Sequence, residues 1–278
     1  MSFFSTHKTL GILGGGQLGK MLLYTTRKWD IKTHVLDPSD EAPSKVACDY
    51  FEVGDFKDYQ TVYEFGKKVD VLTFEIEHVN LDALKQLEKE GVEVYPSAAT
   101  LEVIQNKSTQ KDFYRANNIP TAPHQNFNTL EQLKTAVQNH SLDLPFVWKS
   151  ALMGYDGNGV SVVRNQDQLD ALPDVACLAE DLIPFTHELA VIVCRNPSGK
   201  VLAYPTVEME FHPEANQVEY VLCPTRLGED VTKKAQAIAL QVSESFKHVG
   251  LLAVELFLTE TGEILVNEVA PRPHNSGH

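Results

Sequence analysis

The 278-residue sequence is 43% hydrophobic, and its 38 acidic and 24 basic side chains give a formal net charge of -14. This length and apolar content predict a well-packed globular protein of two domains. The acidic balance argues against nucleic acid and anionic membranes as partners, because no basic face is left to neutralise phosphates; small phosphorylated ligands need only a few placed cations.

Cysteine usage and the apolar runs bear on the compartment. Cys48, Cys177, Cys194 and Cys223 show neither C-x-x-C pairing nor metal-ligand spacing, so we expect buried, reduced thiols. The first residues contain no long apolar run with a cleavage site, and no later run is long enough to span a membrane. These features predict a soluble, cytoplasmic protein.

A glycine-rich stretch follows the first predicted strand. Thr9–Leu13 leads directly into GGGQLG at positions 14–19, and a helical pattern continues to about Lys28. In this setting G-x-G-x-x-G lets the backbone approach an anion at a helix N-terminus. Asp37 ends the next strand, near the position of a ribose-binding acid in dinucleotide-binding folds. Alone, the pattern fits an NAD-dependent enzyme or an ordinary strand-to-helix turn.

Strands and helices alternate up to about residue 95. The predicted elements are helix 59–68, strand 69–74, helix 81–90 and strand 92–95. This alternation predicts a parallel α/β sheet in a domain covering residues 1–105. Glu75 and Glu77 follow a strand end and should face the crevice beside the glycine loop. Two acids there suit a ligand with N–H donors, although a solvated loop start fits equally well.

The character of the chain changes after residue 105. We expect an exposed helix over 106–118, a proline-containing connection, a helix over 130–139 and a strand over 145–149 that ends in Lys149. GYDGNG at 154–159 and a strand over 160–164 follow, which predicts a hairpin flap whose backbone N–H groups fold over phosphates. It is not a Walker loop. A long hairpin turn without a ligand is the alternative.

The remaining elements are strands with one long helix. The predicted strands are 177–183, 188–195, 200–207 and 218–223, and the predicted helix is 228–249. The antiparallel strands with their covering helix complete two α+β lobes, and a cleft between such lobes suits Mg-ATP.

The last hairpin carries two carboxylates within apolar strands. A two-residue loop at Thr261-Gly262 would place Glu255 opposite Glu268. The side-chain period of two would put Phe257 and Val266 on the same face. Opposed carboxylates repel each other unless a partner binds both, and Mg²⁺ holding phosphates is the natural candidate. Two solvated rim glutamates are the alternative, and a longer loop would break this register.

Six segments together resemble the ATP-grasp enzymes of purine biosynthesis, most closely the N5-carboxyaminoimidazole ribonucleotide synthetases: GILGGGQLGKML, TFEIEHV, KSTQKDF, VWKSALMGYDGNGV, AEDLIPFTHELAV and VNEVAPRPHNSGH. The resemblance implies a Rossmann-like domain over 1–105 and a two-lobed ATP-grasp domain over 106–278. It implies carboxylation of 5-aminoimidazole ribonucleotide with ATP and bicarbonate, through carboxyphosphate. It also implies a homodimer and a small C-terminal domain, which this sequence lacks.

The resemblance also implies roles for individual residues. The nucleotide would be bound by Lys107, Lys149, Gly154, Tyr155, Asp156, Gly157, Asn158, Gly159, Val160, Glu180, Asp181, Leu182, Ile183, Glu188, His212, Asn267 and Glu268. Magnesium would be held by Glu255 and Glu268. The catalytic residues would be Arg272, which holds carboxyphosphate, His274, which carries a proton, and Asp156. The ribonucleotide site would be lined by Gln17, Leu18, Glu77, Tyr155, Asp156, His274 and Asn275.

Departures from the family pattern leave other functions open. Asn158 stands where the family usually has a basic residue, and Ala151, Leu152 and Met153 replace basic and glycine residues. A formate-dependent glycinamide ribonucleotide transformylase is a sister reading, although its PRPHDTG-like motif has aspartate in place of Asn275. An NAD-linked oxidoreductase and an inactive nucleotide-binding remnant are the alternatives from other classes.

Overall fold

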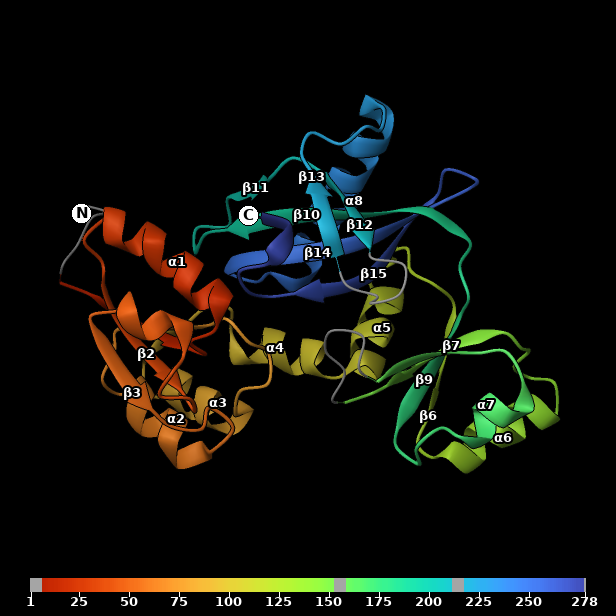
Figure 1. The fold of residues 1–278 in the computed structure, drawn as a ribbon, viewed down its shortest axis with the longest axis horizontal. Helices are drawn as coiled ribbons and strands as arrows, with labels where there is room; N and C mark the ends of the chain where they lie inside the picture. The colour runs from red at the N-terminus through yellow and green to blue at the C-terminus, as the bar shows by residue number, and fades with distance from the viewer. Residues whose placement is uncertain (1–6, 153–158, 212–217, 278) are drawn as a thin grey trace.

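The computed structural model describes residues 7–152, 159–211 and 218–277, which form three sheets with flanking helices (Figure 1). In Figure 1 a parallel sheet lies to the left, a four-stranded antiparallel sheet to the lower right, and a six-stranded sheet above the middle. The combination of an α/β sheet with two α+β lobes confirms the predicted fold class. None of the described helices is long and apolar enough to cross a membrane.

The first sheet is parallel throughout, with strand order β3-β2-β1-β4-β5. Its strands are β1 (Thr9–Leu13), β2 (Lys32–Asp37), β3 (Tyr50–Val53), β4 (Val71–Phe74) and β5 (Glu93–Val94). Its helices are α1 (Gln17–Lys28), η1 (Pro43–Val46), α2 (Tyr59–Gly66), α3 (Leu81–Lys89) and α4 (Ala98–Gln105). Ile12 packs against Leu23 of α1, whereas Leu13 belongs to the core formed with α2 and α3. The alternation of side chains along β1 therefore buries both faces of the sheet.

The four-stranded sheet has the order β6-β9-β7-β8. It consists of β6 (His124–Phe127), β7 (Phe146–Ser150), β8 (Val160–Val163) and β9 (Cys177–Asp181), with helices α6 (Leu130–Gln138) and α7 (Gln166–Asp170). Trp148 and Phe146 of β7 pack with Leu133 of α6 in one core cluster. Lys149, the next residue along β7 from Trp148, faces away from this core, as the strand period requires.

The six-stranded sheet has the order β13-β12-β10-β14-β15, with β11 paired to β10. It consists of β10 (Phe185–Arg195), β11 (Val201–Ala203), β12 (Val207–Phe211), β13 (Val218–Leu222), β14 (Gly250–Thr259) and β15 (Ile264–Ala270). The helices α5 (Lys107–Ala116) and α8 (Glu229–Phe246) share its main core, and η2 (Asn275–Gly277) follows β15. Phe113 stacks on Phe246 with ring centroids 4.2 Å apart, which joins the two helices.

Several elements differ from the sequence prediction. The strand expected at 200–207 contains only β11 and the first residue of β12. The rest of β12 was not predicted, nor were β3, β6, α4 and α7. α5 is not an exposed helix: Lys111 and Tyr114 are 2% and 0% exposed. Asn106 ends α4 and caps α5, since its side chain accepts the Thr109 N–H, and we propose that the domain boundary lies there.

The turn of the last hairpin is longer than predicted. Thr259 donates its N–H to the Glu263 carbonyl at 2.9 Å, so three residues lie between them. The loop's glycine has a φ of +80°, which favours glycine. Leu256 consequently pairs with Val266, and both are buried in the main core. The predicted placement of Val266 on the face of Glu255 is wrong.

Candidate functional site

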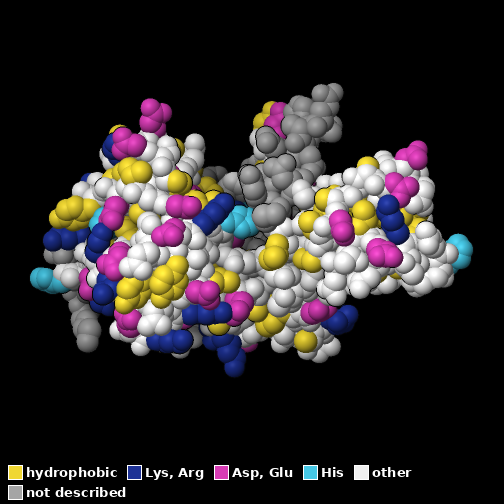
Figure 2. Space-filling model, turned by 90° about the horizontal axis from the view of Figure 1, so that it is seen from below, with side chains coloured by type: hydrophobic (Ala, Val, Ile, Leu, Met, Phe, Trp, Pro, Cys, Tyr) yellow, Lys and Arg dark blue, Asp and Glu magenta, His cyan; other side chains and the backbone are white. Residues whose placement is uncertain are grey.

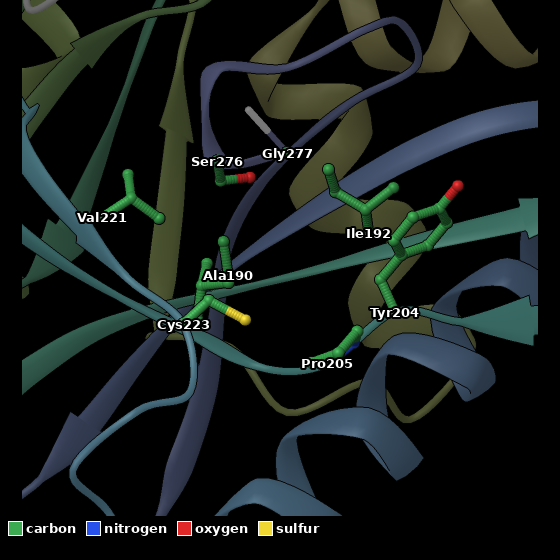
Figure 3. Close-up of a pocket in the computed structure, with 9 residues that line it drawn as sticks. Ala190, Ile192, Tyr204, Pro205, Val221, Cys223, Ser276 and Gly277 are labelled. Atoms are coloured by element: carbon green, nitrogen blue, oxygen red, sulfur yellow. The ribbon is translucent and has the colours of Figure 1, made fainter.

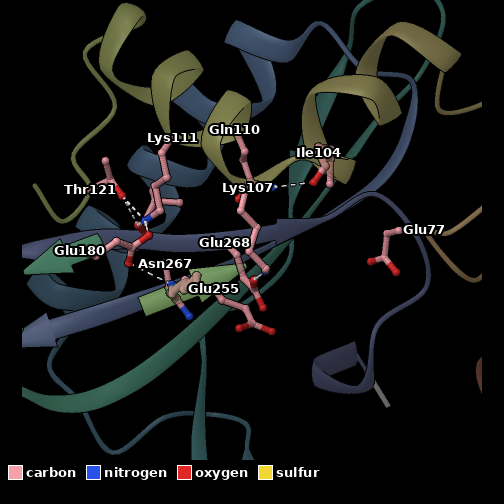
Figure 4. Close-up of polar contacts among 12 residues, drawn as sticks. Glu77, Ile104, Lys107, Gln110, Lys111, Thr121, Glu180, Glu255, Asn267 and Glu268 are labelled. Carbon is pink, nitrogen blue, oxygen red and sulfur yellow. Dashed lines mark hydrogen bonds and ion pairs between the residues drawn. The ribbon is translucent and has the colours of Figure 1, made fainter. Parts of the chain in front are cut away.

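Charged side chains from both antiparallel sheets meet at the N-terminal end of α5. Figure 4 shows Lys107, Glu255, Asn267 and Glu268 close together, whereas Glu77 lies apart from them. The sequence-predicted nucleotide and metal residues of β14, β15 and α5 are therefore in one place.

A β-bulge brings the two predicted metal ligands together. Val254 pairs with Val269, but Leu256 pairs with Val266, so Glu255 stands opposite both Asn267 and Glu268. Two residues facing one are the mark of a bulge, which turns both side chains out of the regular alternation. The predicted juxtaposition of Glu255 and Glu268 is thus present, although the simple two-residue hairpin that we expected to create it is not.

Two lysines approach this bulge from different elements. Lys149 Nζ donates to Asn267 Oδ1 at 2.9 Å and lies 3.0 Å from Glu180 Oε2. Lys107 forms an ion pair with Glu268. Burial alone would lower the pKa of Lys107, but the charge of Glu268 outweighs it and raises the pKa. Lys107 therefore remains cationic beside the bulge.

A third carboxylate, that of Glu188, interacts electrostatically with Glu255 and Glu268. Desolvation, followed by repulsion from Glu255 and Glu268, raises the pKa of Glu188 to about 7. Within the described part of the chain, no three His, Cys, Asp or Glu side chains are arranged to hold a metal by themselves. Two hard carboxylate oxygens beside two lysines fit a Mg²⁺ ion that takes its other ligands from phosphates and water.

An aromatic pair adjoins these acids and was missed at the sequence level. Phe257 pairs across the strands with Glu188, and its ring stacks on Phe185 with centroids 4.6 Å apart and planes 12° from parallel. Phe185 is 43% exposed, so the pair presents an apolar surface beside Glu188. Only the predicted strand alternation of Phe257 hinted at this surface.

The predicted adenine edge and flap are partly described. Glu180 is buried at the end of β9, whereas Asp181 and Leu182 are exposed and Ile183 is half-buried. The Ser150 N–H donates to the Gly159 carbonyl at 2.8 Å, and Lys149 pairs with Val160, so β7 and β8 run antiparallel. Six residues predicted to bind the nucleotide lie outside the described part of the chain: Gly154, Tyr155, Asp156, Gly157, Asn158 and His212.

The predicted catalytic and substrate residues meet across the two domains. Arg272 Nε donates to Glu77 Oε1 at 2.7 Å. His274 is buried, with its Nε2 3.1 Å from Glu255 Oε1, while its Nδ1 accepts the Ser276 N–H at 3.3 Å. This arrangement assigns the Nε2–H tautomer to the neutral ring. His274 thus lies between the bulge and the C-terminal turn.

The other predicted substrate residues are more open. Gln17 and Asn275 are exposed, and Leu18 is half-buried beside Gln17 in the first turn of α1. Among the described residues, no hydrogen bond or ion pair joins these three side chains to Arg272 or His274. The structure therefore brings together only part of the predicted substrate set.

The glycine loop binds the chain's own carboxylates. Glu75 accepts the Gly16 N–H at 2.8 Å and the Gly19 N–H at 3.1 Å, and Asp37 accepts the Gly15 N–H at 2.7 Å. We expected Glu75 to accept N–H groups from a ligand, but it accepts those of the glycine loop instead. A pyrophosphate at this helix N-terminus would have to displace Glu75, which disfavours the NAD reading.

A small apolar cavity of about 200 Å³ lies against β10 of the six-stranded sheet, at Ala190 and Ile192 (Figure 3). Its lining residues are Ala190, Ile192, Tyr204, Pro205, Val207, Val221, Cys223, Ser276 and Gly277. None of them is charged, so this cavity does not match a phosphate-binding site. Figure 2 shows acidic and basic side chains interspersed over the lower face of the molecule, without a broad basic surface.

Comparisons with known proteins agree with this geometry. The family model of the ATP-grasp domain matches residues 112–278, and that of the ribonucleotide synthetase preATP-grasp domain matches residues 7–105. The chain is 36% identical to the N5-carboxyaminoimidazole ribonucleotide synthase of Bacillus subtilis, covering 97% of this chain and 70% of the relative.

Longer relatives and solved structures were also found. The phosphoribosylaminoimidazole carboxylase of Ogataea methanolica is 40% identical over 98% of this chain, which spans only 51% of that protein. The chain therefore spans about half the length of such relatives. A structure of N5-carboxyaminoimidazole synthase from Aspergillus clavatus, in complex with ADP and 5-aminoimidazole ribonucleotide, superposes with a TM-score of 0.87 at 36% identity, covering 98% of this chain and 71% of that one.

Proposed function

This chain belongs to the ATP-grasp family, among the N5-carboxyaminoimidazole ribonucleotide synthases, and we propose that it carboxylates 5-aminoimidazole ribonucleotide with ATP and bicarbonate. The observation that carries the proposal is the bulge at Glu255, Asn267 and Glu268, with Lys107 and Lys149 beside it. Paired carboxylates next to paired lysines suit a metal-bound polyphosphate.

In the proposed complex the nucleotide lies between the two antiparallel sheets. Lys107 and Lys149 bind its phosphates, and the stacked rings of Phe185 and Phe257 offer an apolar surface for the base. Glu188 pairs with Phe257 across the strands, so it stands where a ribose hydroxyl could donate to its carboxylate. The exposed end of β9 after Glu180 supplies backbone groups for the edge of the base.

Glu255 and Glu268 would hold Mg²⁺, for which their oxygen donors are suited. When bound, the ion neutralises the charge on the transferred phosphoryl group. The chain's own contribution is to keep the two carboxylates adjacent through the bulge. Lys107, already paired with Glu268, keeps a second positive charge at the phosphates.

The carboxylation itself is proposed to occur near Arg272. Transfer of the γ-phosphoryl group to a bicarbonate oxygen gives ADP and carboxyphosphate, whose oxygens Arg272 can bind bidentately. The exocyclic amine then attacks the carboxyl carbon, phosphate leaves, and the amine loses a proton. The ribonucleotide site would be lined by Glu77, which contacts Arg272, and by Gln17, Leu18 and Asn275.

Phosphate release from ATP tests the proposal. We expect release to require both bicarbonate and 5-aminoimidazole ribonucleotide, and the product to carry the carboxylate on the exocyclic nitrogen. Phosphate release at the same rate with and without 5-aminoimidazole ribonucleotide contradicts the proposal. Activity with formate and glycinamide ribonucleotide instead would identify the sister enzyme, and Mg-ATP binding without turnover would identify an inactive remnant.

The assembly and location of the protein are further parts of the proposal. By analogy with the family we propose a homodimer that acts in the cytoplasm on small molecules. The net charge of -14 supports the absence of a nucleic-acid or membrane partner. Sedimentation equilibrium of the purified chain checks the dimer, and a single monomeric species would contradict it.

A further inference from the structure

Lys111 is a buried cation that the proposed mechanism does not use. It lies one turn after Lys107 in α5 and is 2% exposed. Its Nζ donates to Thr121 Oγ1 at 2.7 Å and lies 3.5 Å from the Val266 carbonyl. A buried ammonium group is costly unless it is paired, so the reason for its presence should be found in its partners.

The charged partner of Lys111 is Glu180, which is 3% exposed. Lys111 Nζ lies 3.1 Å from Glu180 Oε1, and Lys149 Nζ lies 3.0 Å from Glu180 Oε2. One carboxylate is therefore shared by two lysines, one on each oxygen. Figure 4 shows Lys111 beside Glu180. Lys149 also donates to Asn267, which fixes it between the two sheets.

The charges of this group leave one positive charge in excess. Glu180 balances one lysine, and only Lys149 extends toward the bulge where the phosphates would lie. Desolvation would raise the pKa of Glu180, but Lys149 and Lys111 outweigh it and lower the pKa, so the carboxylate stays ionised. Desolvation lowers the pKa of Lys111 to about 8, and the ammonium form still dominates at neutral pH.

We propose that Lys111 is a positioning residue that neutralises Glu180 and thereby leaves the charge of Lys149 available to the nucleotide's phosphates. The inference rests on the proposed function, because Lys149 is assigned to the phosphates there. Without Lys111, Glu180 would neutralise Lys149 instead. The phosphate site would then lose about one positive charge, while the surface for the base would be unchanged.

Calorimetric titration with adenosine, ADP and a non-hydrolysable ATP analogue, all with Mg²⁺, tests this idea. We expect Lys111→Met to raise the Kd of the ATP analogue about tenfold or more, that of ADP less, and that of adenosine less than about twofold. A merely structural role would weaken all three ligands alike. Lys134→Met is the control, since Lys134 pairs with Asp170 in the lobe that carries Lys149 and Glu180, and it should change none of the three.

A second pair of variants keeps the test decisive if Lys111→Met does not fold. In the Glu180→Gln variant, Lys149 no longer has a carboxylate beside it to neutralise its charge. Adding Lys111→Met to this variant should therefore change the ratio of the Kd of the ATP analogue to the Kd of adenosine by less than about twofold. A tenfold loss in that background, or equal loss of all ligands in the single variant, overturns the inference. Absence of ATP binding by the unmodified protein would instead contradict the proposed function.

Discussion

The carboxylates assigned to the metal already have partners within the chain. Glu268 forms an ion pair with Lys107, and Glu255 Oε1 lies 3.1 Å from His274 Nε2. These contacts keep both acids in place before a ligand arrives. Lys107 and His274 are also the groups assigned to phosphate and substrate, so each acid contacts a residue with a second role.

Removal of either carboxylate charge should abolish turnover with little loss of folding. We expect Glu255→Gln or Glu268→Gln to lower kcat by about a hundredfold or more, because the isosteric amide cannot neutralise a divalent cation. Phosphate release at limiting Mg²⁺ measures the effect. Glu260→Gln, at the exposed tip of the same hairpin, is the control and should retain activity. An active Glu255→Gln or Glu268→Gln enzyme would refute the metal assignment.

His248 should make the folded state sensitive to acid. It is 1% exposed, and desolvation lowers its pKa from 6.5 to about 4. Below about pH 6.5 the unfolded chain protonates this histidine, whereas the folded chain does so only below about pH 4. The free energy of unfolding therefore falls as the pH falls from about 6.5 to about 4. The expected loss across the window is roughly 3 kcal/mol.

Chemical denaturation across that pH range measures the His248 effect. The variant His248→Leu should lose most of this acid dependence, even if its stability at neutral pH changes. His140→Gln, which alters an exposed histidine, should keep it. An unchanged slope in His248→Leu would show that other groups control the acid response.

At the scale of elements, the sequence predicted most strands and helices but not how they meet. β1 was predicted with its observed bounds because its apolar run borders glycines on one side. α5 was wrongly expected to be exposed, because a lysine-containing pattern reads as solvated when its ion-pair partner is far along the chain. Three strands, β6, β7 and β8, separate Lys111 from Glu180 in the chain, and no local pattern encodes their contact.

The hairpin shows the same limit at closer range. Glu255 and Glu268 were correctly placed near each other, but the pairing near the turn was off by one residue. The three-residue loop shifts the register in one direction and the bulge compensates for it. Turn length and bulge position depend on core packing, so the alternation of residue types could not fix either of them.

The turn η2 should be sensitive to a single methyl group. A Cβ on Gly277 would lie 2.6 Å from Ile192 Cδ1, so Gly277→Ala should push η2 away from β10 and disturb His274. We expect the KM for 5-aminoimidazole ribonucleotide to rise by about tenfold or less, since no charged contact is removed. Gly277→Ala combined with Ile192→Val, which removes Cδ1, should recover most of the loss. Failure of this rescue would show that the close contact is not the cause.

For the whole molecule, polar contacts join the three sheets where the ligands are proposed to bind. Arg272 contacts Glu77 of the N-terminal domain, and Lys149 contacts Asn267 across the two antiparallel sheets. The sequence predicted the parallel domain and the two lobes from the order of strands and helices. Their mutual orientation depends on contacts between distant residues, which only the structure supplies.

Ligand binding should stabilise the whole chain if the lobes close on a nucleotide. We expect Mg-ATP at about a hundred times its Kd to raise the free energy of unfolding by about 2.7 kcal/mol. Thermal or chemical unfolding measures the shift, and chelation of Mg²⁺ should remove most of it. NADH at the same concentration should give no shift. Stabilisation by NADH would revive the oxidoreductase reading.

The glycine loop of the N-terminal sheet bears on whether this domain binds other metabolites. Its donors at Gly16 and Gly19 are satisfied by Glu75, which is tethered to the same domain. A tethered competitor acts at an effective concentration in the millimolar range, which a dilute free ligand does not reach. We therefore expect the domain to keep the architecture of a dinucleotide binder without binding free dinucleotides.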